Sequence, residues 1–170
     1  MSEPLTLYKL IVLYMLDKVD FPLTNSQISS FILDKGYTTY FTLQSVLAEL
    51  TESKLIRQET IRNSSYFSLT ESGEETLLYF HKRISSAIRS EIDEYMKENK
   101  MQLRDEVSVL ADYYKNTANE YSVRCLVKEK HSNPIDLTIT VPDEAQAKAV
   151  CANWRTKCQA IYEFVMKELL

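Results

Sequence analysis

The chain has 170 residues, 45% of them hydrophobic, and a formal net charge of −4 at pH 7. This length and composition suffice for one large core or two small ones, so a globular protein is expected. The negative charge excludes a protein that binds nucleic acid mainly through a large excess of Lys and Arg.

No segment has the features of a membrane span or a secretory signal. The longest uninterrupted apolar run is Leu10 to Leu16, which is too short for a bilayer that needs about 20 apolar residues. The three cysteines are odd in number and lack a CxxC pair, which favours free thiols in a reducing compartment. We therefore expect a cytoplasmic protein without membrane contact.

The first predicted helix runs from Pro4 to Lys18 and is apolar on nearly every side. One apolar stripe is expected to pack against the two helices that follow. The other would pack against the C-terminal half of the chain or against a second subunit. The alternative is a helix that is fully buried in the core of a monomer.

The second predicted helix has clear start and stop signals. Thr24 and Gln27 have the spacing of a capping box, and Leu23 with Ile28 has that of a hydrophobic staple. Gly36 follows the last apolar position, where a left-handed residue often ends a helix. The helix is therefore predicted between Thr24 and Gly36.

A third helix is predicted to begin after Thr39, which can act as its N-cap. No Lys or Arg lies between Tyr40 and Ser53, so this helix carries no positive side chain. Its core face has apolar residues at i, i+3, i+4 and i+7, namely Leu43, Val46, Leu47 and Leu50.

Two short β-rich runs, residues 55–60 and 66–69, flank a segment of turn composition at 62–65. Helix, turn, helix and hairpin in this order are typical of a winged helix-turn-helix, here over residues 1–70. Such a module usually presents its second helix to the major groove of double-stranded DNA and its hairpin to the flanking backbone. DNA binding is therefore the leading hypothesis.

Exposed polar side chains of this module are the candidate DNA contacts. Gln can pair with adenine, Ser and Thr can bond to base edges or phosphates, and Arg62 at the hairpin tip is the best single candidate. The alternatives are a solvated helix face and an exposed arginine on a turn. Residues 1–70 hold six cations and seven anions, so a monomer should bind weakly and a dimer would compensate. The full set is Tyr37, Thr38, Thr39, Tyr40, Thr42, Gln44, Ser45, Arg57, Arg62, Asn63 and Ser64.

Two motifs carry a resemblance to known families. LAELTESKLI at 47–56 and FSLTESGEE at 67–75 resemble winged-helix transcription regulators of the MarR and PadR kinds, in which a Leu-Thr-x-x-Gly element closes the wing. Residues 69–73 match that element, with Thr70 as the cap of the next helix. The whole chain is similar to an uncharacterised bacterial family known only as a domain of unknown function and predicted to hold a winged helix. The resemblance implies DNA binding and regulation of transcription.

Residues 71–99 are predicted to form one long connecting helix, because apolar residues keep three- and four-residue spacing from Leu77 to Met96. In MarR-like and PadR-like regulators an extended helix beyond the wing commonly pairs with its two-fold mate. The resemblance therefore implies a homodimer through this helix. The alternative is a spine against which the C-terminal half folds.

Residues 100–170 change to a two-residue period. Alternating runs at 107–113, 121–127 and 135–141 predict a three-stranded antiparallel sheet. Asp143 can cap a final long helix that covers the sheet. The predicted class is thus α+β: an N-terminal winged helix-turn-helix, a long connecting helix, and a C-terminal sheet covered by a helix.

The aromatic residues of this part are candidate liners of a ligand pocket, in a possible effector or dimerisation domain. The alternative is an ordinary core, and no motif supports a small-molecule effector. The candidates are Tyr113, Tyr114, Tyr121 and Trp154.

Catalysis is not expected. The sequence has no Gly-rich phosphate loop, nucleophile elbow or zinc motif, and it contains only two His. We therefore predict no enzyme, no cofactor and no metal. Two functions remain in competition: a homodimeric transcription regulator bound to double-stranded DNA, and a winged-helix protein-interaction module without DNA binding.

Overall fold

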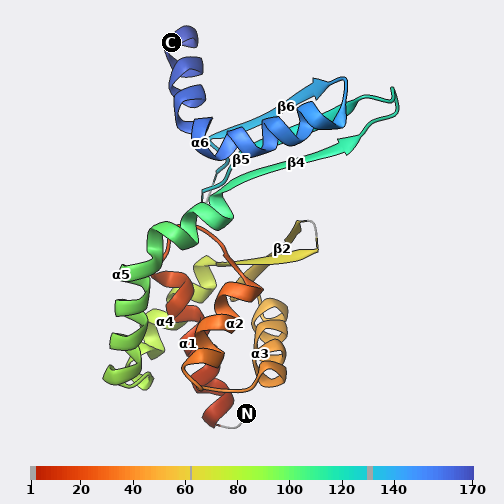
Figure 1. Cartoon of the computed structure of the whole chain (residues 1–170). Helices are drawn as coiled ribbons and strands as arrows, with labels where there is room; N and C mark the ends of the chain where they lie inside the picture. The colour runs from red at the N-terminus through yellow and green to blue at the C-terminus, as the bar shows by residue number, and fades with distance from the viewer. Residues whose placement is uncertain (1–2, 62, 130–131) are drawn as a thin grey trace. The chain divides into compact units, whose positions relative to one another are not determined.

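A computed structural model describes residues 3–61, 63–129 and 132–170 (Figure 1). The chain forms two compact units, Met1–Leu103 (unit 1) and Arg104–Leu170 (unit 2). The predicted α+β class is confirmed, with N-terminal helices beside a small wing-like sheet, a long helix, and a C-terminal antiparallel sheet packed against another long helix. Among the described helices, none combines the length and the apolar character that a membrane span requires.

The first three helices of unit 1 begin and end close to the predicted residues. They are α1 (Glu3–Asp17), α2 (Asn25–Asp34) and α3 (Tyr40–Glu52). The capping box of α2 is confirmed: Thr24 Oγ1 accepts from the Gln27 amide at 3.1 Å, and Gln27 Oε1 accepts from the Thr24 amide at 3.0 Å. Gly36 has φ of +70°, the left-handed conformation expected after a helix.

A three-stranded antiparallel sheet lies beside these helices, with strand order β1-β3-β2. Its strands are β1 (Leu23–Thr24), β2 (Ile56–Ile61) and β3 (Ser64–Leu69). Ile61 pairs with Ser64, so the turn is shorter than the predicted segment 62–65. Asn63 takes φ of +63°, which suits a tight hairpin turn. Arg62, the best predicted contact residue, lies outside the described residues.

The prediction of one continuous helix over residues 71–99 is wrong. The segment instead forms α4 (Glu71–Phe80), a 3₁₀ turn η1 (His81–Arg83) and α5 (Ser86–Ser108). Ile84 between them is extended and fully buried, and Ser85 Oγ accepts from the Ile88 amide at 3.2 Å as a new cap. The break lets α4 and η1 pack on α1 while Asp93 of α5 accepts a hydrogen bond from α1.

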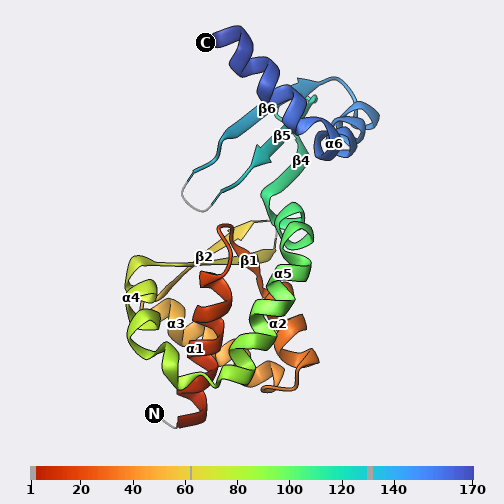
Figure 2. The same ribbon diagram turned by 90° about the vertical axis from the view of Figure 1, so that its left-hand side faces the viewer.

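Helix α1 is the centre of unit 1 (Figures 1 and 2). Every residue from Leu10 to Leu16 is buried, and α3, α4, η1 and β3 pack around it. Tyr14 donates its hydroxyl to Asp93 of α5 at 2.8 Å. The middle of the helix is therefore covered within unit 1, as the alternative of a buried core helix predicts. Packing of α1 against a second subunit stays a prediction.

Unit 2 is an antiparallel sheet of β4 (Val109–Lys115), β5 (Tyr121–Val127) and β6 (Ile135–Val141), in that order. Helix α5 continues through Ser108, so the first strand begins two residues later than predicted. Helix α6 (Glu144–Leu169) is capped by Asp143, whose Oδ1 accepts from the Gln146 amide at 2.8 Å. It lies across one face of the sheet, and its last part turns away (Figures 1 and 2).

Candidate nucleic-acid interface

Helix α3 and the β2–β3 hairpin lie on the same side of unit 1 (Figure 1). The predicted inner face of α3 is confirmed, since Leu43, Val46, Leu47 and Leu50 are all buried. On its outer side, Ser45 and Tyr40 are exposed. The unit therefore presents the outer side of α3 beside an exposed hairpin.

Gln44, a predicted base-reading residue, is held inside unit 1. The Asn25 side-chain amide donates to Gln44 Oε1 at 2.7 Å, and Gln44 Nε2 donates to Asn25 Oδ1 at 3.0 Å. Ser29 Oγ also donates to Asn25 Oδ1 at 2.8 Å. Because both polar atoms of the Gln44 amide are used, this side chain fixes α2 against α3.

This amide pair gives a testable prediction for stability. Gln44→Ala should lower the free energy of unfolding by about 1–2 kcal/mol, because the half-buried Asn25 amide loses its partner. Asn25→Ala combined with Gln44→Ala should cost less than the sum of the single changes, with a coupling of about 1 kcal/mol in urea unfolding. Strictly additive losses would show that the pair contributes nothing.

Tyr37 is also engaged within unit 1. Its hydroxyl donates to Glu91 Oε2 of α5, and its ring meets Phe31 edge-on with centroids 5.9 Å apart. Burial, and then the bond to Glu91, raises the pKa of Tyr37 well above its ordinary value. Tyr37 therefore ties the α2–α3 turn to α5 and keeps its proton.

The N-terminus of α3 carries a group of small hydroxyls. Thr39 Oγ1 accepts from the Thr42 amide at 3.3 Å, and it donates to Thr42 Oγ1 at 3.0 Å. Thr39 and Tyr40 are exposed, whereas Thr38 and Thr42 are half-buried. Since no acidic residue lies in the first turn, the partial positive charge of this helix end is not neutralised there.

The hairpin contributes the remaining predicted residues. Arg57 is exposed on β2 opposite Ser68, and Asn63 and Ser64 are exposed at the turn. Gln58 Nε2 donates to Ser65 Oγ at 3.1 Å across the two strands, which supports the register near the tip. The described hairpin thus offers one arginine and several small polar groups.

The charges around α3 are nearly balanced. Glu49 of α3 forms an ion pair with Lys9 of α1, with 2.5 Å between Nζ and Oε2. Glu52 is exposed at the C-terminal end, and Lys54 follows it in a left-handed conformation with φ of +60°. A surface of this kind attracts phosphates only weakly.

Sequence reasoning missed Phe41. This side chain is 83% exposed, and its ring lies edge-on to Tyr40 with centroids 6.0 Å apart. Its position, two residues before the buried Leu43, puts it roughly 200° away from the core face of a helix with about 100° per residue. The exposure of Phe41 could therefore have been predicted from its position opposite the core face.

The aromatic candidates of unit 2 lie in different surroundings. Trp154 is buried and donates its Nε1 proton to Leu126 O at 3.3 Å, while Tyr114 is exposed. Tyr113 packs edge-on against Tyr121 and donates its hydroxyl to Glu144 Oε1 at 3.0 Å. This bond, aided by some desolvation, raises the pKa of Tyr113.

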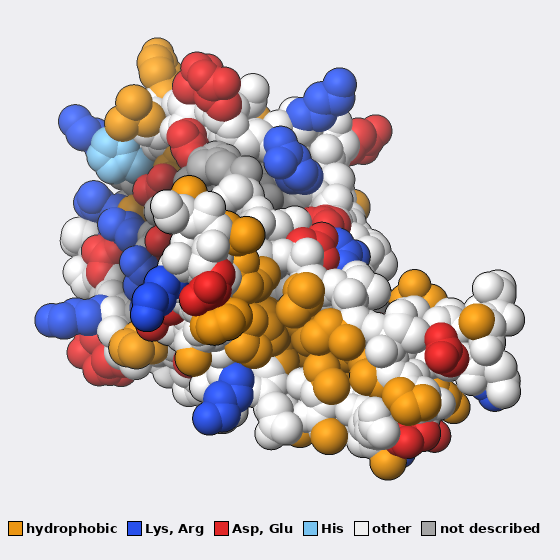
Figure 3. All heavy atoms as spheres, turned by 90° about the horizontal axis from the view of Figure 1, so that it is seen from above, with side chains coloured by type: hydrophobic (Ala, Val, Ile, Leu, Met, Phe, Trp, Pro, Cys, Tyr) orange, Lys and Arg blue, Asp and Glu red, His pale blue; other side chains and the backbone are white. Residues whose placement is uncertain are grey.

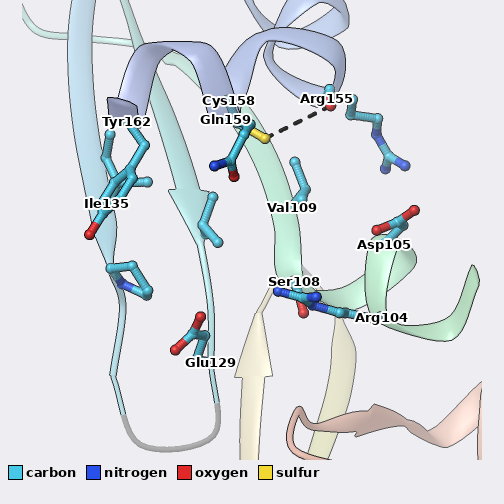
Figure 4. Close-up of a pocket in the computed structure, with 12 residues that line it drawn as sticks. Arg104, Asp105, Ser108, Val109, Glu129, Ile135, Arg155, Cys158, Gln159 and Tyr162 are labelled. Atoms are coloured by element: carbon cyan, nitrogen blue, oxygen red, sulfur yellow. Dashed lines mark hydrogen bonds between the residues drawn. The ribbon is translucent and has the colours of Figure 1, made fainter. Parts of the chain in front are cut away.

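A cavity of about 640 Å³ in unit 2 is lined by other residues (Figure 4). Its polar wall contains two arginines and two carboxylates, and its apolar wall comes from the strands. None of the four predicted aromatic residues lines it. Its charged and hydroxyl-bearing liners are Arg104, Asp105, Ser108, Glu129, Arg155 and Tyr162.

The fold and the exposed face define an α+β protein with a helical unit that presents one helix and a hairpin, followed by a sheet-and-helix unit. The chain belongs to the family described as Domain of unknown function (DUF4364), which matches residues 8–169. Neither the curated proteins nor the solved structures gave a match to the chain.

Proposed function

We propose that unit 1 is a winged helix that binds double-stranded DNA, and that the protein is a homodimeric regulator of transcription. The observation that carries this proposal is the exposed outer side of α3 next to the exposed β2–β3 hairpin, on one side of the unit. A recognition helix and a wing occupy these places in winged-helix proteins. The amide pair between Asn25 and Gln44 supports the proposal, because it holds α3 rigidly on α2.

The contacts divide into two groups under this proposal. Thr39, Tyr40, Thr42 and Ser45 face the groove or its edge, where hydroxyls bond to phosphates and base edges. Arg57, Asn63 and Ser64 contact the backbone, together with Arg62. Gln44 and Tyr37 act by positioning α3 and the turn before it, since their polar atoms are bonded within unit 1.

The test is binding of the full-length protein to duplexes selected from a random library, followed by fluorescence anisotropy at several salt concentrations. Arg57→Ala with Arg62→Ala should weaken binding at least about tenfold and reduce the salt slope by about two for each subunit, because two phosphate contacts are lost. Lys97→Ala with Lys100→Ala removes two exposed cations of α5 and should leave affinity almost unchanged. If the folded wild-type protein selects no duplex at low salt, the DNA proposal fails.

The exposure of Phe41 favours a second function, a protein-interaction module that uses the same face. An aromatic side chain that is 83% exposed on a helix without Lys or Arg is typical of a docking surface for another protein. This function predicts capture of a protein partner that is lost on Phe41→Ala, in a protein that selects no DNA. Phe41→Ala in a DNA-binding protein should instead change affinity by less than about tenfold.

A further inference from the structure

The cavity of unit 2 is formed by three parts of the fold, and all of its lining residues belong to this unit (Figure 4). Its apolar wall includes one row across the sheet, because Val109 pairs with Val127 and Val127 pairs with Ile135. The last turn of α5 contributes a second wall. The third comes from α6, whose lining residues have the spacing of one helix face: Arg155, Cys158, Gln159 and Tyr162.

Ser108 brings a hydroxyl without a partner to this cavity. The residue lines the cavity and is only 2% exposed. Its backbone oxygen accepts from the Lys128 amide at 2.7 Å, which fixes it beside the end of β5. Its Oγ has no hydrogen-bond partner among the residues that the structure describes. Since a buried hydroxyl without a partner costs free energy, a ligand that bonds to it would restore the missing interaction.

Four charged side chains line the cavity, two of each sign. They are Arg104 and Arg155, and Asp105 and Glu129. All four residues are exposed, and within the described ranges none of these side chains forms an ion pair or a hydrogen bond. A guanidinium group can hold a carboxylate with two parallel hydrogen bonds, and a carboxylate can hold an ammonium group. The lining therefore offers free binding groups for both signs of charge.

The balance of charge in the cavity indicates what kind of ligand it suits. A ligand of one sign would be attracted by two of the four groups and repelled by the other two. Figure 3 shows Lys and Arg side chains interspersed with Asp and Glu around hydrophobic ones on the face seen there, so its described part has no field of one sign that would favour such a ligand. A molecule with one group of each sign meets attraction at both.

We propose that this cavity binds a small zwitterion with an aliphatic body, either a free apolar amino acid or a short peptide of such amino acids. The carboxylate of the ligand binds the arginines and accepts from the Ser108 hydroxyl. Its ammonium group binds Asp105 or Glu129, and its aliphatic part lies on the row of Val109, Val127 and Ile135. The cavity volume of about 640 Å³ is within the range of about 300–1,000 Å³ for small-molecule sites.

The first experiment is isothermal titration calorimetry of the full-length protein without DNA. The probes are leucine, valine, leucyl-leucine and valyl-valine, and at least one should bind with a Kd below about 1 mM. The tightest probe shows whether the site suits the free amino acid or the peptide. Its N-acetyl derivative lacks the ammonium group and its carboxamide lacks the carboxylate, so each should bind at least about tenfold more weakly. The inference fails if none of the four probes binds, or if either derivative binds as tightly as its parent.

Two double variants assign the charged groups of the protein to those of the ligand. Arg104→Gln with Arg155→Gln should weaken binding of the tightest probe at least about tenfold and remove its advantage over the carboxamide. Asp105→Asn with Glu129→Gln should instead remove its advantage over the N-acetyl derivative. A purely structural effect would weaken all three molecules alike, and that result, or wild-type affinity in the arginine variant, would overturn the assignment.

A matched control removes two cations of α6 that do not line the cavity. Lys157→Gln with Lys167→Gln changes two exposed residues of the same helix, and it should leave the affinity for every probe unchanged. A loss as large as that of the arginine variant would mean that the probes respond to the charge of α6 in general. Binding at this cavity would then be ruled out as the cause.

Ser108→Ala separates a role in binding from a role in the fold. It should weaken binding of the tightest probe by about three- to tenfold, because the ligand loses one hydrogen bond. The urea midpoint of the protein without ligand should stay the same or rise, because the variant removes a buried hydroxyl that has no partner among the described residues. Unchanged affinity together with lower stability would show that the hydroxyl serves the fold and not a ligand.

The inference does not depend on DNA binding, and the two can fail separately. A protein that binds a probe but selects no duplex would refute the proposed function alone. A protein that selects a duplex but binds none of the probes would refute this inference alone.

Discussion

Replacement of Trp154 by alanine is expected to lower the free energy of unfolding of unit 2 by about 3–5 kcal/mol. The side chain is 2% exposed and forms the core of unit 2 with Val123, Cys125 and Ala147. The change leaves a large cavity and also leaves Leu126 O without the indole donor. Because the core of unit 2 is small, a loss of this size should leave it only marginally stable.

The measurement is urea unfolding of the full-length variant followed by circular dichroism, since Trp154 is the only tryptophan and its fluorescence is lost with it. Unit 2 should unfold before unit 1, as a separate transition. Trp154→Phe is the control, because it keeps an aromatic ring but removes the indole donor, and it should cost about 1–2 kcal/mol. A loss below about 1 kcal/mol for Trp154→Ala would contradict the central role of this residue.

Gly73→Ala is expected to cost about 2–3 kcal/mol in unit 1. A Cβ at this position would lie 2.1 Å from Leu55 O and 2.7 Å from Leu69 Cδ1, so the backbone itself must shift. The shift would also disturb the start of α4, where Thr70 Oγ1 accepts from the Gly73 amide at 3.1 Å and donates to Lys54 O at 2.7 Å. Glycine is required at this position because there is no room for a Cβ atom.

Gly36→Ala is the comparison that distinguishes a steric conflict from an unfavourable backbone conformation. This glycine has φ of +70°, and no atom lies within 4 Å of the point that a Cβ would occupy. Its replacement should therefore cost only the strain of a left-handed alanine, about 1 kcal/mol. In thermal and urea unfolding, the Gly73→Ala variant should be clearly less stable than the Gly36→Ala variant. Equal losses, or the reverse order, would show that the close approach at Leu55 relaxes without cost.

The proposed regulator has two separate requirements, a DNA-facing surface and a dimer. The first uses small hydroxyls and few charges, so its affinity as a monomer should be low. The second is a contact between two copies of the chain, which residues 10–16 of α1 cannot supply because they are buried in unit 1. A dimer would double a modest footprint, which is how a surface with little positive charge reaches useful affinity.

The sequence by itself determined the elements whose signals are local. The capping box of Thr24 and Gln27, the caps at Thr39 and Thr70, and the cap at Asp143 all formed as predicted. The alternating runs became the strands of unit 2, because a two-residue period buries one face of a sheet. The caps act over three or four residues and the alternating runs over seven, so each signal lies within one short segment of the chain.

Only the tertiary structure decided what depends on distant partners. Gln44 is hydrogen-bonded to Asn25, 19 residues away, and Tyr37 to Glu91, 54 residues away. The role of neither side chain could therefore be predicted from its own segment. The break at Ile84 interrupts an apolar spacing that continues on both sides, because burial of that residue in unit 1 outweighs the continuation of the helix.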